Sequence, residues 1–321
     1  MKFLTKGIAM FDPNNNRNYP PQRNGFFSGR LLIAIGIAIV GLFMYFSQIE
    51  TNPVTGERQH VALSPDQEIK LGLESAPEMS AQMGGEVPAN DPRAVIVKKI
   101  GNYLVEHTAA NGSPWKFNFH LLADTKTVNA FALPGGQIFI TLGLYNRLEN
   151  EGELAGVLGH EMGHVIERHS AEQMAKNQLG QWLIVAVATG ASDGSQQGGN
   201  NAAVIAQMVN QMIQLRYSRK DESEADLWGV KLLSQSGYNP QALIRVMQVL
   251  KEASGGSSGG FDFFQSHPNP DLRIEQIQAY LKEHPNLVKG SYGLPLNKRS
   301  GAPEEEDSSL RSLFDLLQRS N

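Results

Sequence analysis

The sequence predicts a mainly helical α+β protein with a small antiparallel sheet and an N-terminal transmembrane helix. Apolar residues recur at helical spacing in segments such as 93–109 and 151–176, which predicts amphipathic helices. Residues 114–122 alternate between apolar and polar side chains, and residues 129–141 place two apolar runs around a Pro-Gly-Gly turn, so both segments predict β-strands. The run 31–49 has no charged residue and is long enough to cross a bilayer.

Composition narrows the class of protein and the kind of metal site. The chain has 321 residues, of which 41% are hydrophobic, and this fits one globular domain with appendages. The formal net charge of −4 gives no indication of a nucleic-acid partner. The sequence contains no cysteine, so disulfides and thiolate ligands are excluded and His, Asp and Glu remain as metal ligands.

Residues 1–30 are expected to form a disordered basic tail ahead of the apolar run. A cleaved signal peptide is disfavoured because the tail is long and no small-x-small cleavage site follows 31–49. A buried core helix is disfavoured because the run has no polar face. We therefore expect a single membrane anchor, with the tail in the cytoplasm and residues after about 50 outside it. This arrangement favours a bacterial inner membrane with the domain in the periplasm.

The first helix after the anchor is expected to begin at the N-cap Ser64 and to end near Ser75, because Pro77 disfavours a helical residue before it. Met79 is expected to fill a gap in packing. His120, in the strand predicted at 114–122, has no spaced partner and is expected to be structural. Residues 182–189 are apolar but too short to cross a membrane, which favours a buried helix end over a segment that dips into a bilayer surface.

The helix predicted from Glu151 to about Lys176 carries the motif His160-Glu161-Met-Gly-His164. Two histidines four positions apart lie on one helix face, about 6 Å apart along the axis, so both can reach one metal ion. The carboxylate of Glu161 follows the first histidine, where it can take a proton from a metal-bound water. This is the zinc-hydrolase signature, although so short a motif also arises by chance. His169 should lie about 140° around the helix from His164 and face away from the metal, either on the surface or in the second layer around the metal site.

A third ligand must come from elsewhere, because position 170 is Ser and the helix lacks the third His of longer zinc motifs. Glu222 and Asp226 are four positions apart on one face of a later predicted helix, and Glu224 points elsewhere. An acidic helix surface would explain these charges, but the incomplete site upstream favours Glu222 as the ligand, with one position left open for water. Asp226 should then hydrogen-bond the free ring nitrogen of a ligand histidine. We expect one Zn²⁺ per chain.

Four motifs occur in the order and approximate spacing of a known family: His160-Glu-Met-Gly-His164, Ser218-Arg-Lys-Asp-Glu-Ser-Glu-Ala-Asp226, Asn129-Ala-Phe-Ala-Leu-Pro-Gly-Gly136 and Ser266-His-Pro-Asn-Pro-Asp-Leu-Arg-Ile274. Over about residues 50–285 the chain resembles metallopeptidase family forty-eight, the HtpX, BepA and Oma-type gluzincins. The resemblance implies a zincin-like metalloprotease domain at 50–300, with Glu222 as the third zinc ligand. The basic tail, the Gly/Gln-rich insert at 190–201 and the lack of a lipid-anchoring Cys depart from the family.

By the family's pattern the segment around His267 lies over the cleft, although a lone His before Pro is usually a turn residue. We hypothesise that His267 belongs to the catalytic site, where it either stabilises the developing oxyanion or blocks the open metal position in a resting state. The glycine-rich hinge at 254–260 would let the segment move. Arg273, at the start of a helix predicted at 272–282, is expected to pair with a carboxylate. Residues 301–321 are expected to form a mobile tail.

Together these features predict a membrane-anchored zinc-dependent endopeptidase in which Glu161 is the general base. A substrate would add as an extended strand beside residues 130–134 or 137–141, a mode that suits unfolded or damaged envelope proteins and a role in quality control. The expected partners are such proteins and the lipid bilayer, and no nucleic acid. The alternative is a membrane-tethered chaperone or binding module whose zinc is structural and closed by His267.

Overall fold

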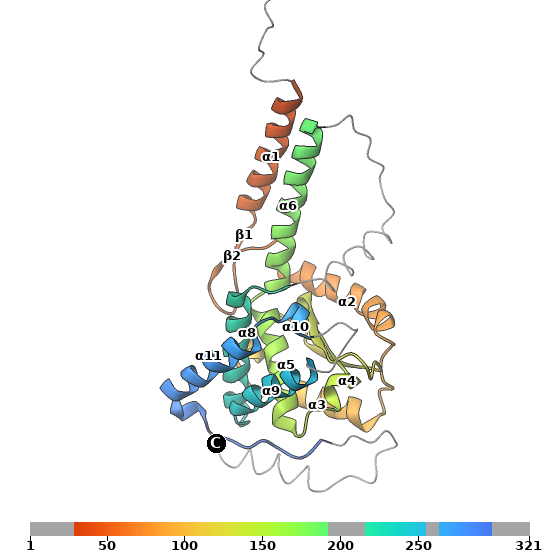
Figure 1. Cartoon of the computed structure of the whole chain (residues 1–321), viewed down its shortest axis with the longest axis vertical. Coiled ribbons are helices and arrows are strands. Elements are labelled where there is room, and N and C mark those ends of the chain that lie inside the picture. Colours follow the sequence, from red (N-terminus) through yellow and green to blue (C-terminus); the bar gives the residue numbers. More distant parts are fainter. Residues whose placement is uncertain (1–28, 192–215, 255–262, 297–321) are drawn as a thin grey trace, which may run out of the picture.

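Two helices, α1 (Gly29–Ser47) and α6 (His169–Ala191), lie side by side and project from a mainly helical body (Figure 1). This computed structural model describes residues 29–191, 216–254 and 263–296. The two helices approach closely, because a Cβ added at Gly41 would lie 2.6 Å from Cβ of Trp182. Four predicted features lie wholly or mostly outside the described residues. They are the basic tail at 1–30, the Gly/Gln-rich insert at 190–201, the hinge at 254–260 and the C-terminal tail at 301–321.

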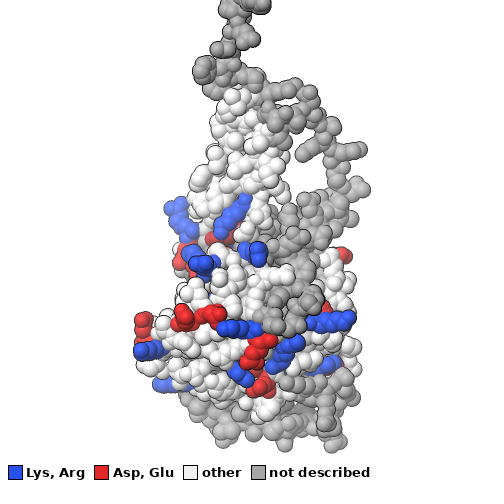
Figure 2. All heavy atoms as spheres, viewed as in Figure 1, with Lys and Arg blue, Asp and Glu red and all other residues white. Residues whose placement is uncertain are grey.

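The projecting helices expose apolar side chains along most of their length. Phe43 is 71% exposed on α1, and Val187 is 72% exposed on α6. Among the described residues, Figure 2 shows no acidic or basic side chain on the visible face of the outer part of the projection. The run predicted at 31–49 does form a helix, Gly29–Ser47, but within the described part of the chain no helix is long and apolar enough to cross a membrane. The prediction of a buried helix end at 182–189 is wrong, because this segment packs along α1 and leaves its other side exposed.

The body contains a three-stranded sheet with strand order β3-β5-β4. The antiparallel pair of β4 (Ala130–Leu133) and β5 (Gln137–Thr141) confirms the predicted strand–turn–strand. β3 (Asn118–Leu122) pairs with β5 in parallel, so the prediction of a wholly antiparallel sheet is wrong. The Pro134–Gly136 turn folds β4 against one side of β5, and β3 occupies the other side. The middle strand β5 therefore has no free edge, and β4 is an outer strand.

α2 (Pro65–Gln82) covers the turn between β4 and β5. A Cβ at Gly135 would lie 2.3 Å from the Cα of Ile69, so this position requires glycine both for its φ of 78° and for the close contact. The helix begins as predicted, with Ser64 and Gln67 forming a capping box, but it continues through Pro77. Burial of Met79 against a cluster that includes Phe139 offsets the hydrogen bond lost at Pro77.

Helix α5 (Glu151–Ile166) runs through the centre of the body and is buried on every side. It begins at the N-cap Asn150, whose side chain accepts a hydrogen bond from the backbone N–H of Glu153. α8 (Arg219–Gln235) crosses it closely, because Gly163 has no side chain: a Cβ there would lie 2.8 Å from the carbonyl oxygen of Ala225. The surrounding elements are α3 (Pro92–His107), α4 (Leu142–Tyr145), α9 (Gln241–Ser254), α10 (Phe263–Ser266) and α11 (Pro270–Glu283), with short 3₁₀ turns at Ala109–Gly112, Pro134–Gly136 and Pro285–Leu287.

The helix predicted as one unit from 151 to 176 is broken, because Arg168 adopts a left-handed φ of 60° between α5 and α6. Its buried guanidinium explains the break: Nη2 lies 2.7 Å from Glu68 Oε1, and Nη1 lies 2.9 Å from Glu50 Oε2. The small hairpin of β1 (Ile49–Thr51) and β2 (Arg58–His60) adds a cap to the end of α5. There Asn52 donates to the carbonyl of Ile166 and Gln59 to that of Glu167.

Candidate metal centre

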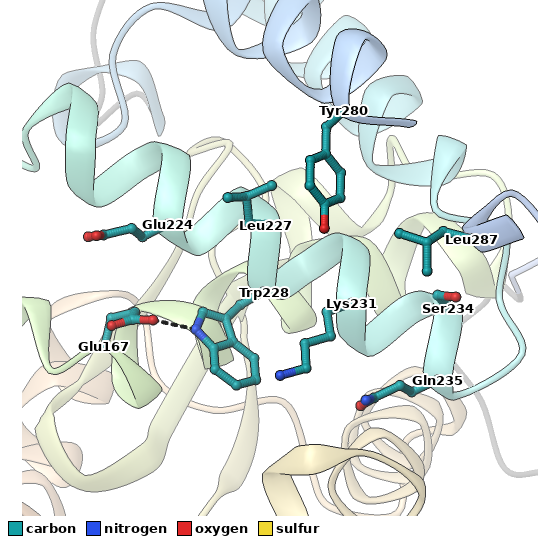
Figure 3. Close-up of a pocket in the computed structure, with 9 residues that line it drawn as sticks. All are labelled: Glu167, Glu224, Leu227, Trp228, Lys231, Ser234, Gln235, Tyr280 and Leu287. Carbon is teal, nitrogen blue, oxygen red and sulfur yellow. Dashed lines mark hydrogen bonds between the residues drawn. The ribbon is translucent and has the colours of Figure 1, made fainter. Parts of the chain in front are cut away.

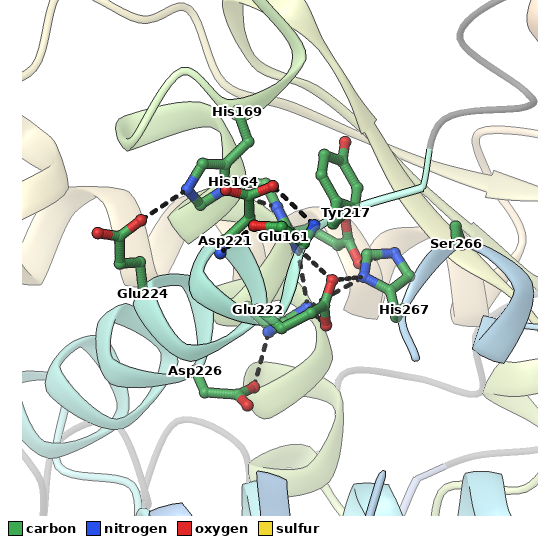
Figure 4. Close-up of polar contacts among 12 residues, drawn as sticks. Glu161, His164, His169, Tyr217, Asp221, Glu222, Glu224, Asp226, Ser266 and His267 are labelled. Carbon is green, nitrogen blue, oxygen red and sulfur yellow. Dashed lines mark hydrogen bonds and ion pairs between the residues drawn. The ribbon is translucent and has the colours of Figure 1, made fainter. Parts of the chain in front are cut away.

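Four buried side chains from three parts of the chain meet at one point in the body (Figure 4). His160 and His164 come from α5, Glu222 comes from the first turn of α8, and His267 directly follows α10. One potential ligand atom from each side chain lies within 4.8 Å of the other three. The three residues predicted as metal ligands are therefore brought together, with His267 added as a fourth.

The helical framework explains how the first three side chains converge. The histidines are one helical turn apart on α5, and their Nε2 atoms lie 3.1 Å apart. Ser218 and Asp221 form a capping box that begins α8 directly before Glu222. The close crossing at Gly163 then holds the Glu222 carboxylate within 3.6 Å of His164 Nε2 and 3.7 Å of His160 Nε2.

The arrangement fits a tetrahedral zinc ion. Ligand atoms about 2.0–2.1 Å from zinc are separated from one another by about 3.3 Å in such a geometry. Here His267 Nδ1 lies 2.9 Å from Glu222 Oε1 and 3.4 Å from His160 Nε2. Glu222 Oε2 is paired with Arg273, whose Nη1 lies 2.6 Å away, whereas both oxygens of the neighbouring Glu161 are buried without a hydrogen-bond partner among the described residues. A cation bound between the four groups would compensate this second buried carboxylate.

Glu161 lies beside this point with both carboxylate oxygens buried and without hydrogen-bond partners in the described structure. Burial raises the pKa of this carboxyl above its usual value. Its Oε1 lies 3.8 Å from His267 Nε2. A basic group next to a metal-ligand set is the arrangement that water activation requires.

His267 is held in the site by the backbone on both sides of α10. The N–H of Phe263 donates to the carbonyl of Val128, and the N–H of Tyr217 donates to the carbonyl of Ser266. The rings of Phe263 and His267 stack with centroids 4.2 Å apart. Of the two roles considered for His267, this geometry favours the one in which Nδ1 blocks the fourth metal position.

Asp226 and Arg273 contact two of the potential ligands, His160 and Glu222, from outside the metal position. Asp226 Oδ1 lies 3.0 Å from His160 Nδ1, the contact predicted for it. Arg273 donates to both oxygens of Asp226 and lies 2.6 Å from Glu222 Oε2, so its predicted pairing with a carboxylate is confirmed. Burial alone would raise the pKa values of both carboxyls. The charges and hydrogen bonds of Arg273, His160 and His267 outweigh burial, so both pKa values lie below the usual range.

Two residues next to His164 were not predicted to contact it. His169 is buried and its Nδ1 lies 2.9 Å from His164 Nδ1. Of the two places expected for it, the surface is wrong and the second layer around the metal centre is right, although the ring is directed at His164 and not away from it. The angle of 140° assumed a continuous helix, whereas the break at Arg168 turns His169 back toward the centre. Tyr217 stacks on the face of the His164 ring, with centroids 4.0 Å apart. The sequence carries no local signal for either contact.

A separate pocket of about 320 Å³ lies on the outer side of α8 and contains none of the four potential ligands (Figure 3). Trp228 forms part of its wall, with Nε1 donating to Glu167 and Lys231 lying over the indole ring. Glu224 lines the same pocket, and its carboxylate contacts His169 and Lys220 instead of the metal centre. Glu224 therefore points away from the ligands, as the spacing predicted.

Comparison with known proteins gives one family and several relatives. The model of peptidase family M48 matches residues 93–281. The mitochondrial metalloendopeptidase OMA1 of Schizosaccharomyces pombe is 30% identical over 240 residues, which cover 74% of this chain and 68% of that protein. The beta-barrel assembly-enhancing protease of Escherichia coli K12 is 30% identical over 255 residues, covering 78% of this chain. The chain spans about half the length of that bacterial relative, 51%.

Proposed function

The chain belongs to peptidase family M48 and is a metallopeptidase, and from this premise we propose that it is a membrane-attached, zinc-dependent endopeptidase of unfolded or misassembled proteins. The observation that carries the proposal is the meeting of His160, His164 and Glu222 beside the buried carboxylate of Glu161, whose oxygens have no hydrogen-bond partner among the described residues. Its relatives are named as a metalloendopeptidase and as a protease that enhances β-barrel assembly.

In the proposed reaction His160, His164 and Glu222 hold the zinc ion. When bound, zinc polarises the scissile carbonyl and lowers the pKa of a water molecule. Glu161 accepts a proton from the attacking water on a carboxylate oxygen and delivers it to the leaving amine. Asp226 accepts a hydrogen bond from His160 Nδ1, which leaves Nε2 free to bind the metal.

The structure represents a closed form in this proposal. His267 Nδ1 lies among the ligand atoms, in the place that water and substrate need. Substrate entry would require the segment at 263–267 to leave, with loss of the two backbone hydrogen bonds that hold it. An extended substrate would then bind along the outer strand β4 through main-chain hydrogen bonds.

The position of His267 also supports the second candidate function, a binding or chaperone module with a structural zinc. Four protein ligands leave no position for an activated water. Against it stands Glu161, because a structural site has no use for a buried carboxylate whose oxygens have no hydrogen-bond partner in the described structure. Zinc content and cleavage of unfolded casein, measured together on the full chain and on His267→Ala, distinguish the two. A rise in cleavage on His267→Ala with retained zinc supports the peptidase, and one equivalent of zinc with no cleavage by either protein supports the structural module.

We propose that the exposed apolar surface of α1, joined by that of α6, attaches the chain to a membrane. The orientation predicted from the basic residues of 1–30 would place the metal centre outside the cytoplasm. Alkaline carbonate extraction of membranes tests the attachment, and protease access in spheroplasts tests the orientation. Release of the full chain by carbonate would contradict attachment through α1.

A further inference from the structure

A buried hydrogen-bonded chain connects the metal centre to the surface of α8 through His169 (Figure 4). His164 Nδ1 lies 2.9 Å from His169 Nδ1, and His169 Nε2 lies 3.3 Å from Glu224 Oε2. Lys220 Nζ lies 2.8 Å from the other oxygen of Glu224. The side chain of Glu224 is 24% exposed, so the carboxylate is the end of the chain that reaches solvent.

Only one set of donors and acceptors satisfies every link of this chain with neutral rings. A histidine that binds a metal through Nε2 carries its proton on Nδ1, so His164 donates to His169. His169 Nδ1 is then the acceptor, and its proton is on Nε2, directed at Glu224. A carboxylate accepts and does not donate, which matches that last link.

The break between the two helices makes this chain possible. His169 is the first residue of α6, and it reaches His164 because Arg168 turns the backbone through a left-handed conformation. The two metal-site histidines are therefore held differently, His160 by Asp226 directly and His164 by a carboxylate acting through a second imidazole.

We propose that His169, oriented by Glu224, is the positioning residue for His164 and keeps the Nε2 lone pair of that histidine directed at the metal. This inference rests on the proposed zinc site but not on peptidase activity. Loss of a hydrogen bond that orients a ligand histidine typically lowers metal affinity by about 10–100-fold. Because the bond is to Nδ1 of His169, an acceptor placed near that atom should be sufficient.

Zinc affinity of the full chain, measured by chelator competition, tests the proposal. His169→Leu should lower the affinity about 10–100-fold, while His169→Asn, whose side-chain oxygen can replace Nδ1 as acceptor, should stay within about threefold of the parent. Glu224→Leu should give an intermediate loss, because His169 remains but is no longer oriented. The visible absorption of the cobalt(II)-loaded protein should change in His169→Leu and be restored in His169→Asn.

His120→Leu is the matched control, because His120 is also buried and hydrogen-bonded, to Glu86 and Gln137, but contacts no potential ligand of the metal centre. It should destabilise the fold without changing zinc affinity. Equal zinc affinity in His169→Leu and the parent would overturn the proposal, as would equal losses in His169→Leu and His169→Asn. His169, Asp221 and Glu224 also lie close enough to hold an ion, so two zinc equivalents with one lost on His169→Leu would instead assign His169 as a ligand. A parent that binds no zinc would contradict the proposed function itself.

Discussion

At the scale of single residues, Arg273 balances the charge of the metal centre. Its guanidinium is fully buried and contacts both Asp226 and Glu222. These two carboxylates raise the pKa of Arg273 above its already high value, although burial acts in the opposite direction. Without a metal ion, this side chain is the main positive charge that balances two buried carboxylates. A bound zinc ion would supply part of that positive charge.

Replacing Arg273 with Met should therefore destabilise the metal-free protein more than the zinc-loaded protein. Removing one partner of a buried ion pair costs about 3–5 kcal/mol, and zinc would offset part of that cost. The measurement is the melting temperature of parent and variant with excess zinc and with chelator. Arg93→Met is the control, since Arg93 pairs with Asp91 away from the site and its loss should not depend on zinc. Equal losses with and without zinc in Arg273→Met would contradict this account.

The residues of the site differ in how far the sequence could predict them. His160, Glu161 and His164 follow from spacing on one helix, and Glu222 follows from the face it shares with Asp226 on another. His169 could not be placed, because the turn at Arg168 depends on Glu68 and Glu50, which are about a hundred positions away in sequence. A local period cannot report a helix break that is caused by distant partners.

At the scale of elements, the crossing of α5 and α8 sets the distance from the histidines to Glu222. The helices meet at Gly163, where an added Cβ would lie 2.8 Å from Ala225 O and 2.9 Å from Trp228 Cβ. Backbone so close cannot yield without moving one helix. Gly156, on the same helix, has ordinary room: its added Cβ would lie 3.5 Å from its nearest neighbour.

Gly163→Ala should consequently lower zinc affinity and peptidase activity at least tenfold by forcing α8 away from α5. Gly156→Ala should keep both, and it should stabilise the helix by up to about 1 kcal/mol because Ala has the higher helix propensity. Zinc titration and casein cleavage on both variants provide the comparison. If Gly163→Ala binds zinc as tightly as Gly156→Ala, the crossing does not control the site.

Elements whose ends depend on local chemistry were predictable, and those that depend on tertiary packing were not. The capping residue Ser64 correctly gave the start of α2, but its end was placed before Pro77 although the helix continues to Gln82. Packing of Met79 and its neighbours against the sheet outweighs the propensity of proline to end a helix. The parallel pairing of β3 with β5 is likewise a tertiary choice that alternation along a strand does not report.

At the scale of the whole molecule, Arg168 connects the N-terminal segment to the end of the metal-bearing helix. It contacts Glu50 directly after α1 and Glu68 on α2, while Asn52 and Gln59 cap the carbonyls of Ile166 and Glu167. Burial raises the pKa of Glu68 to about 7, and the charge and hydrogen bond of Arg168 offset only part of that effect. The stability of this connection should thus depend on pH near neutrality.

A carboxyl whose pKa is higher in the folded than in the unfolded state stabilises the fold at low pH, and this contribution is lost as pH rises. For Glu68 the loss should extend from about pH 4.5 to about pH 7 and amount to about 3 kcal/mol. Melting temperatures measured between pH 5 and 8 should fall less in Glu68→Gln than in the parent. Glu74→Gln changes an exposed carboxylate on the same helix and should follow the parent. Parallel curves for parent and Glu68→Gln would refute the assignment.

The proposed function requires that the four-residue centre bind zinc and that Glu161 move a proton there. The most direct measurement compares zinc content and casein cleavage of His267→Ala with those of the double variant Glu161→Gln, His267→Ala. Gln keeps the shape of Glu161 but cannot accept the proton, so the account predicts one zinc per chain in both proteins and cleavage reduced at least 10²-fold in the double variant. Undiminished cleavage by the double variant, with zinc still bound, would contradict it.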